Sequence, residues 1–380
     1  MKIIKRLLPV LFSLLLVLAL SMLCGCSRTD SSDAEEVLKS ELDQLKNLDS
    51  DTTQKYISYT EMFPDATENT KLSDEIQNVF SLFFQQFDYK ILDVNVDKDK
   101  QSAQANLRLV TLDAHALAED FSKAQLKHEI SQSASSEEAT EQTISLEERY
   151  MLLDELLKSN DYQTVERNCT ISLDASDKDG ETSWEIRRTN TLENDLVGGL
   201  MNDLTDPDIL SPEDTILVYL NTLKNMSTEE LGNYLNADSI ISTEDPAKIS
   251  LAEALVKQVH STFDYSIGET TVSGYTATVT ANITTFDSDA ILENYQKELD
   301  TYLASVDAVI DGAQKRYEKS YSLLLEYIEE NTATKTVETT FTLINDGASW
   351  KLEDAGTVFG QALFGTLSSS PVEDNQETNG

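Results

Sequence analysis

The stretch Thr111-Leu-Asp-Ala-His-Ala-Leu-Ala-Glu-Asp-Phe-Ser-Lys123 recurs further along the chain as Thr285-Phe-Asp-Ser-Asp-Ala-Ile-Leu-Glu-Asn-Tyr-Gln-Lys297. In both copies an Asp, Asp113 or Asp287, stands directly before a helical run, where a carboxylate can cap the first turn. Apolar and β-branched residues that alternate with polar ones precede it, which is typical of a strand with one solvated face. The sequence therefore contains the same predicted strand-to-helix junction twice.

Further matches surround this junction in the same order, with offsets that drift from 178 to 166 residues. The matched segments are Leu45-Lys46-Asn47 with Leu223-Lys224-Asn225, Phe87-Asp88-Tyr89 with Phe263-Asp264-Tyr265, Thr164-Val165-Glu166 with Thr336-Val337-Glu338, Ser183-Trp184-Glu185-Ile186 with Ser349-Trp350-Lys351-Leu352, and Gly199 with Gly365. They are mostly apolar residues or element boundaries. A duplicated architecture explains them better than a duplicated catalytic site.

Each half is expected to contain the same series of elements. An amphipathic helix comes first, capped by Asp33 in one half and by Ser211, followed by Pro212, in the other. A short helix, an apolar helix and a β-hairpin follow, then a long helical excursion over about 114–160 or 288–331, and finally a second hairpin and a short helix. The first excursion includes the polar stretch 131–143, which we interpret as the tip of a helical hairpin.

The N-terminus carries an export signal. Lys2, Lys5 and Arg6 precede an apolar run that is too short to span a membrane, and Leu23-Cys24-Gly25-Cys26 follows. The last four residues resemble a bacterial lipobox, in which cleavage before the cysteine is coupled to attachment of a diacylglyceryl group. We therefore expect lipid attachment at Cys26, with palmitate-type acyl chains that hold the protein at the extracytoplasmic face of the cell membrane.

The boundaries follow from these signals. They are a signal peptide at 1–25, a lipid anchor and short tether at 26–32, a first domain at 33–202, a linker at 203–212, a second domain at 213–367 and a disordered tail at 368–380.

The formal net charge of −39 becomes −42 when the three basic residues of the signal are removed. Such a chain would be repelled by nucleic acid, so we expect no nucleic-acid partner. Removal of the signal leaves Cys169 and the acylated Cys26, so no internal disulfide is expected.

The order of helices and antiparallel strands resembles the NTF2-like, cystatin-like α+β fold. More specifically, the chain resembles lipid-anchored proteins of unknown function from Gram-positive bacteria. The features that carry this resemblance are Cys26, the aromatic-Asp-Tyr entry to the sheet, the Thr-x-Asp-x-x-x-[Leu/Ile]-x-Glu start of the inserted helix and the Ser-Trp-x-[Ile/Leu] closing strand. The resemblance implies an α+β protein with two tandem domains, each with N-terminal helices, a curved antiparallel sheet and an inserted helical hairpin.

Candidate chemical groups are few. His115, His128 and His260 are scattered, and Cys169 is expected to be a small buried residue that aligns with Phe341. The stretch 174–180 departs from a calcium-binding loop at both essential ends, which favours a hairpin turn. The pairs Asp88-Tyr89 and Asp264-Tyr265 fit a helix end and strand start better than a pocket, and Trp184 and Trp350 fit a core better than a glycan-stacking surface.

We therefore expect no catalytic residue, no cofactor and no metal, and a non-enzymatic binding or interaction module whose partner is an envelope protein or a small ligand. Two alternatives remain open. The first is a solute-binding lipoprotein of an ABC importer, and the second is a hydrolase or isomerase that uses a pocket inside the domain.

Overall fold

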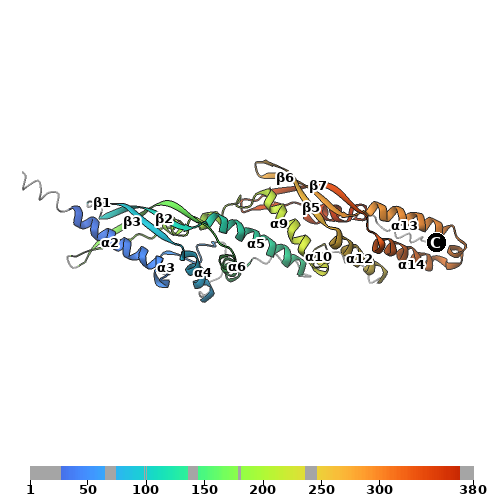
Figure 1. Ribbon diagram of the computed structural model, residues 1–380, viewed down its shortest axis with the longest axis horizontal. Helices are drawn as coiled ribbons and strands as arrows, with labels where there is room; N and C mark the ends of the chain where they lie inside the picture. The colour runs from blue at the N-terminus through green and yellow to red at the C-terminus, as the bar shows by residue number, and fades with distance from the viewer. Residues whose placement is uncertain are drawn as a thin grey trace, which may run out of the picture. The chain divides into compact units, whose positions relative to one another are not determined.

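The computed structural model describes residues 27–64, 74–97, 99, 101–135, 144–178, 181–235 and 246–368. Over these residues the protein is α+β, with two four-stranded antiparallel sheets in the orders β1-β2-β3-β4 and β5-β6-β7-β8 (Figure 1). It divides into two compact units, which consist of residues 1–121 with 144–205 and of residues 122–143 with 206–380. The second unit thus includes a segment taken from the first repeat.

In the first repeat the described elements follow the expected order. They are α2 (Ser27–Lys46), α3 (Ser50–Tyr56), α4 (Asp74–Phe84), β1 (Asp88–Asp97), β2 (Ser102–Leu112), α5 (Ala114–Ser135), α6 (Leu146–Ser159), β3 (Thr164–Lys178), β4 (Glu181–Ile186), α7 (Asn190–Leu196) and α8 (Leu200–Asp203). β2 alternates between buried and exposed residues, so one face of the sheet is covered and the other is solvated. Helices α2, α3 and α4 run along one side of this sheet (Figure 1).

The second repeat follows the same order. Its elements are α9 (Pro212–Asn225), α10 (Thr228–Tyr234), α12 (Pro246–Thr262), β5 (Asp264–Ser273), β6 (Thr276–Phe286), α13 (Ser288–Leu303), α14 (Val306–Glu330), β7 (Thr334–Asn345), β8 (Trp350–Leu352), α15 (Ala355–Phe364) and the 3₁₀ turn η1 (Gly365–Ser368). α13 and α14 form an antiparallel pair beside the sheet (Figure 1). Ser211 caps α9 and Pro212 stands in its first turn, as predicted.

Two duplicated motifs meet at the start of each sheet. Lys46 Nζ lies 2.7 Å from Asp88 Oδ1, and Lys224 Nζ lies 2.7 Å from Asp264 Oδ1. Both aspartates open a strand, so the interpretation of the Asp-Tyr pairs as element boundaries is confirmed. Each ion pair ties the end of the first long helix of its repeat to the first strand.

The interior face of each sheet is filled by side chains. Alternate residues of β2 and β6 are fully buried, and so are Phe84 of α4 and Tyr150 of α6 in the first unit and Phe341 of β7 and Phe359 of α15 in the second. The rings of Phe341 and Phe359 lie 5.3 Å apart between centroids. Burial of such residues is the dominant favourable contribution to folding, so these clusters hold the helices on the sheets.

The N-terminal boundary differs from the prediction. α2 begins at Ser27, so Asp33 lies inside the helix rather than at its cap, and the segment expected to be an extended tether is helical. No helix-breaking residue separates Ser27 from the apolar stripe of α2, which allows the helix to extend backwards. Six helical residues span about 9 Å, against about 20 Å when extended.

The pairing of β3 and β7 corrects the predicted alignment of the repeats. Leu107 pairs with Cys169, and Ala281, which is the equivalent of Leu107, pairs with Thr339. Cys169 therefore corresponds to Thr339 and not to Phe341, so the Thr-Val-Glu match is displaced by two residues. A two-residue displacement keeps every side chain on the same face, because side chains in a strand alternate with period two.

Candidate functional site

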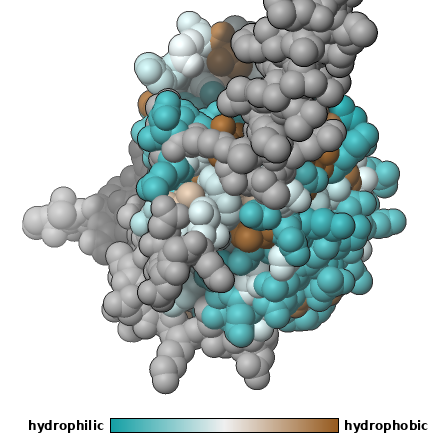
Figure 2. Space-filling view, turned by 90° about the vertical axis from the view of Figure 1, so that its left-hand side faces the viewer, coloured by the Kyte–Doolittle hydropathy of each residue, from teal (hydrophilic) through white to brown (hydrophobic). Residues whose placement is uncertain are grey.

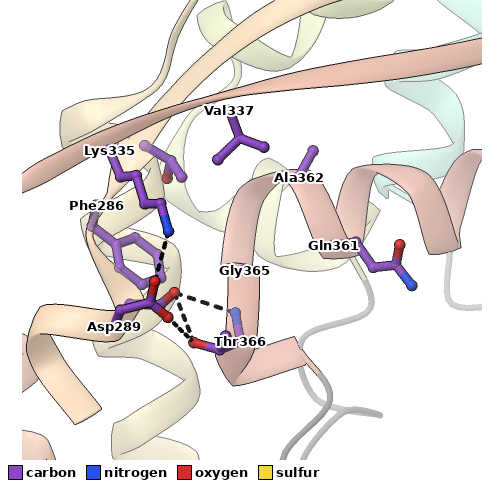
Figure 3. A pocket seen from close by; sticks show the side chains of 10 residues that line it. Phe286, Asp289, Lys335, Val337, Gln361, Ala362, Gly365 and Thr366 are labelled. Carbon is purple, nitrogen blue, oxygen red and sulfur yellow. Dashed lines mark hydrogen bonds and ion pairs between the residues drawn. The ribbon is translucent and has the colours of Figure 1, made fainter. Parts of the chain in front are cut away.

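A shallow pocket of about 340 Å³ lies in the second unit, where the recurring strand-to-helix junction meets the last helix. Its walls come from the end of β6, the start of α13, the start of β7 and the turn from α15 into η1 (Figure 3). The lining residues are Thr285, Phe286, Ser288, Asp289, Lys335, Val337, Gln361, Ala362, Gly365 and Thr366. None of them was singled out as a site from the sequence, although Gly365 and the 285–297 segment are part of the duplication.

The polar groups of the pocket bond mainly to one another. Lys335 Nζ lies 2.6 Å from Asp289 Oδ2, and Thr366 Oγ1 donates to Asp289 Oδ1 at 3.0 Å (Figure 3). Ser288 Oγ accepts from the backbone N–H of Thr366 at 3.2 Å. On the far wall, Thr285 Oγ1 donates to the carbonyl oxygen of Leu363. These bonds fix the wall of the pocket.

The contact between Asp289 and Lys335 moves the pKa of each group further from neutral pH. The hydrogen bond from Lys335 lowers the pKa of Asp289, with a smaller contribution from Thr366. The same contact raises the pKa of Lys335. A general acid or base works best with a pKa near the working pH, so this pair is suited to holding its charges rather than to moving protons.

A glycine shapes the rim. Gly365 has φ +54, and a Cβ built on it would lie 2.5 Å from Ser288 Oγ. The residue is therefore constrained both by its left-handed backbone and by the close approach of Ser288. Gly199, its counterpart in the first unit, has φ +93 and lies against the guanidinium of Arg167.

The corresponding place in the first unit carries different chemistry. His115 occupies the position of Asp289, and its Nδ1 lies 3.6 Å from Asp203 Oδ1. Arg167 occupies the register position of Val337. The positive-φ glycine has thus been kept in both units, while the charges around it have been replaced.

The other candidates have structural roles. Cys169 is buried, so the prediction of a buried residue is confirmed; it donates to Asp195 Oδ2 at 3.3 Å, and burial raises its pKa. Trp184 and Trp350 are 8% and 6% exposed, so their rings belong to the core rather than to a glycan-binding surface. Asp113 and Asp287 accept bonds from first-turn N–H groups of α5 and α13, as predicted.

The remaining sequence candidates do not assemble into a site. His128 bonds to Gln132 on α5, and His260 lies in the last turn of α12. Asp174, which begins the stretch tested as a calcium loop, lies in β3 and pairs with Arg187. Among the described residues there is no group of three or more His, Cys, Asp or Glu side chains that could hold a metal ion. Cys26, the predicted lipid-attachment residue, lies outside the described residues.

In the parts of the chain that the structure describes, no helix is both long enough and apolar enough to cross a bilayer. Among the residues coloured in Figure 2, most are hydrophilic, and the hydrophobic ones are few.

No family model matches the chain, and no curated protein matches it. A solved structure that does match is that of YcdA from Bacillus subtilis, a protein classed provisionally as a lipoprotein. The two are 12% identical, the match covers 73% of this chain and 96% of the other, and the TM-score is 0.29. A likeness of this size carries no argument about function.

Proposed function

We propose that this protein is an extracytoplasmic lipoprotein of the cell envelope, attached to the membrane through a diacylglyceryl group on Cys26. Its two repeats have the NTF2-like, cystatin-like architecture and act as a non-enzymatic interaction module. The anchor follows from the lipobox-like Leu23-Cys24-Gly25-Cys26 after an apolar export signal. Two acyl chains give stable attachment, because each buried methylene contributes about 0.8 kcal/mol.

The observation that carries the interaction role is the filled interior of both sheets. Enzymes and carriers of this fold class would need an open cavity between sheet and helices, but large side chains such as Phe84 and Phe341 occupy that space here. The pocket of the second unit lies at the end of its sheet instead, and its charged residues are bonded to each other. What is left for recognition is the outer surface.

The two alternatives have less support. A solute-binding lipoprotein is expected to have lobes of alternating βαβ units, whereas both sheets here are antiparallel. A hydrolase or isomerase needs a proton donor or acceptor that titrates near neutrality, and the shifts of Asp289 and Lys335 run the opposite way. Reproducible turnover of cell-wall fragments that one substitution abolishes would contradict the non-enzymatic proposal.

The anchor is tested by replacing Cys26 with Ala. We expect Cys26→Ala to lose incorporation of a labelled fatty acid and to change its membrane fractionation, because the acylated thiol is removed. Cys24→Ala is the matched control, since it changes a neighbouring cysteine that is not the attachment point, and it should keep the label. Equal labelling of the two variants would reject attachment at Cys26.

A further inference from the structure

The turn between α13 and α14 exposes an aliphatic patch that the fold does not use. Leu303, Val306, Val309 and Ile310 are 48%, 73%, 78% and 74% exposed. Val306, Val309 and Ile310 stand at i, i+3 and i+4 of the first turns of α14, so they share one face, and Leu303 ends the preceding helix. Single exposed apolar residues are common, whereas a contiguous group on one helix face is a candidate interaction site. We call these four residues the hairpin tip.

The side chains of the hairpin tip lie outside the buried core of their own unit. α14 packs on the core through Tyr321, Leu323 and Ile328, which lie much further along the helix. Near the tip, Gly312 interrupts the helical geometry with φ 69 and ψ 179. Ala308 is buried and its carbonyl oxygen accepts from Arg316, so the turn is a formed structure that presents its aliphatic side chains outward.

The first repeat has no such surface in its sequence. The stretch that the sequence assigns to the corresponding tip, 131–143, contains four serines, and its other residues are Gln, Glu, Thr and Ala. The architecture of the repeats therefore does not require an apolar tip.

The charges beside the hairpin tip indicate which kind of partner can bind it. Asp300 and Asp307 are exposed next to the aliphatic residues. The cations on the same segment are engaged, Lys315 with Asp311 at 3.7 Å and Arg316 with the carbonyl of Ala308 at 3.0 Å. Surface helices that enter a bilayer carry Lys and Arg on their polar face, so acidic residues here oppose docking on an anionic membrane.

Size and symmetry disfavour a second copy of the chain. Four aliphatic side chains expose on the order of a few hundred Å², well below the ~800 Å² per partner of a stable interface. A symmetric contact would also place the exposed Asp300 and Asp307 of both copies in one interface. A partner with a concave surface that encloses the hairpin tip would bury it from both sides. Such a partner also need not bring acidic residues of two copies together.

We propose that the hairpin tip docks into an apolar groove of a second protein, and that Lys and Arg residues edge this groove and face Asp300 and Asp307. The contact is of the helix-in-groove kind, with Val306, Val309 and Ile310 as the anchors. It rests on the proposed function for its location, because the partner must share the extracytoplasmic compartment.

The experiment uses the full chain in cells that express it, with the photo-crosslinking residue p-benzoylphenylalanine at Ile310. The control position is Tyr275, which is 77% exposed at the β5–β6 turn. We expect a discrete crosslink from position 310 and none from 275. The crosslinked peptide, located by mass spectrometry, should be apolar with Lys or Arg beside it. Asp307→Lys should reduce the yield at least fivefold, while Glu329→Lys, an exposed charge reversal near the other end of α14, should not.

Binding of the hairpin tip to a bilayer or to a second copy of this chain would give different experimental results. Ile310→Trp in the acylated protein on phosphatidylcholine/phosphatidylglycerol vesicles would be quenched by brominated lipid if the hairpin tip entered a bilayer, and that result would overturn the proposal. Crosslinks only between copies of this chain, no crosslink, or equal yields at 310 and 275 would overturn it as well. A failed Cys26→Ala test with intact crosslinking would reject the anchor and leave the groove proposal standing.

Discussion

The indole Nε1 of Trp350 donates a hydrogen bond of 2.9 Å to Asp208 Oδ1, a residue 142 positions earlier in the chain. Asn345 Nδ2 donates to the same oxygen at 3.1 Å and to the carbonyl of Pro207 at 3.2 Å. Asp208 belongs to the stretch 203–212 that the sequence predicts as a linker. From Asp206 onward this stretch is part of the second unit, and Asp208 secures it to the closing strands.

Replacing Asp208 with Ala should destabilise the second unit by about 1 kcal/mol, because two donors of the core lose their common acceptor. Denaturant unfolding followed by tryptophan fluorescence measures the effect. Asp206→Ala is the control, since the Asp206 side chain accepts from the backbone N–H of Asp208 rather than from the closing strands, and we expect a smaller loss. Equal losses would show that the bond to Trp350 contributes nothing specific.

Gly365→Ala should cost about 1–3 kcal/mol, because the new side chain meets both an unfavourable backbone region and the hydroxyl of Ser288. Gly274→Ala is the matched control. Gly274 has a similar φ of +62 but open space around it, so it reports the backbone contribution alone. Gly365→Ala should lower the unfolding temperature more than Gly274→Ala does. Adding Ser288→Ala to Gly365→Ala should restore part of the lost unfolding temperature, and no restoration would contradict the predicted clash.

Asp346 should stabilise the β7–β8 turn in a pH-dependent way. The hydrogen bond from Lys351, together with backbone N–H bonds from Ala348 and Ser349, lowers the pKa of Asp346 to about 2 from its ordinary value of 3.8. A lowered folded-state pKa means that the contribution is complete above the ordinary value and is lost as the pH falls through about 2.

The variant Asp346→Asn removes this charge while it keeps an oxygen for the two N–H groups. We expect it to be less stable than the natural chain by at most about 1 kcal/mol at neutral pH, because the pair is partly exposed. The difference between the two chains in urea unfolding should shrink as the pH approaches 2. A constant difference over that range would show that ionisation of Asp346 plays no part.

Cys169 should react with thiol reagents only when the first unit unfolds. Burial, reinforced by the neighbouring carboxylate of Asp195, raises its pKa and disfavours the thiolate that such reagents need. In a chain whose Cys24 and Cys26 are replaced by Ser, titration with a chromogenic disulfide should therefore detect little reaction in the folded protein and one thiol in denaturant. Rapid reaction of the folded protein would contradict the position of Cys169 in the core.

Much of the local structure could be predicted because its causes are local. Ser211 with Pro212 and the carboxylates of Asp113 and Asp287 begin helices through bonds within a single turn. β-hairpins follow from alternation and turn residues within about twenty positions. Asp33 failed as a cap because nothing in the preceding residues stops a helix, and a cap forms only where a helix has to begin.

The candidate site could not be predicted in the same way. Asp289 and Lys335 are 46 residues apart, and only the pairing of β6 with β7 brings them together. The displaced Thr-Val-Glu match shows why. A shift of two residues keeps the in-out alternation of the strand, so the hydrophobic pattern is the same in both registers. Register decides which side chains become neighbours, and it is decided by long-range hydrogen bonds and packing.

By itself the sequence determined the duplication, the α+β class, the helix caps and the strand alternation, because each depends on residues close together in the chain. Tertiary structure alone decided the register of β3 and β7, the attachment of Asp208 to Trp350, the pocket around Asp289 and the outward display of Val309 and Ile310. The physical reason is that burial and hydrogen bonding across distant segments depend on which surfaces meet, and periodicity within one segment carries no information about its partner.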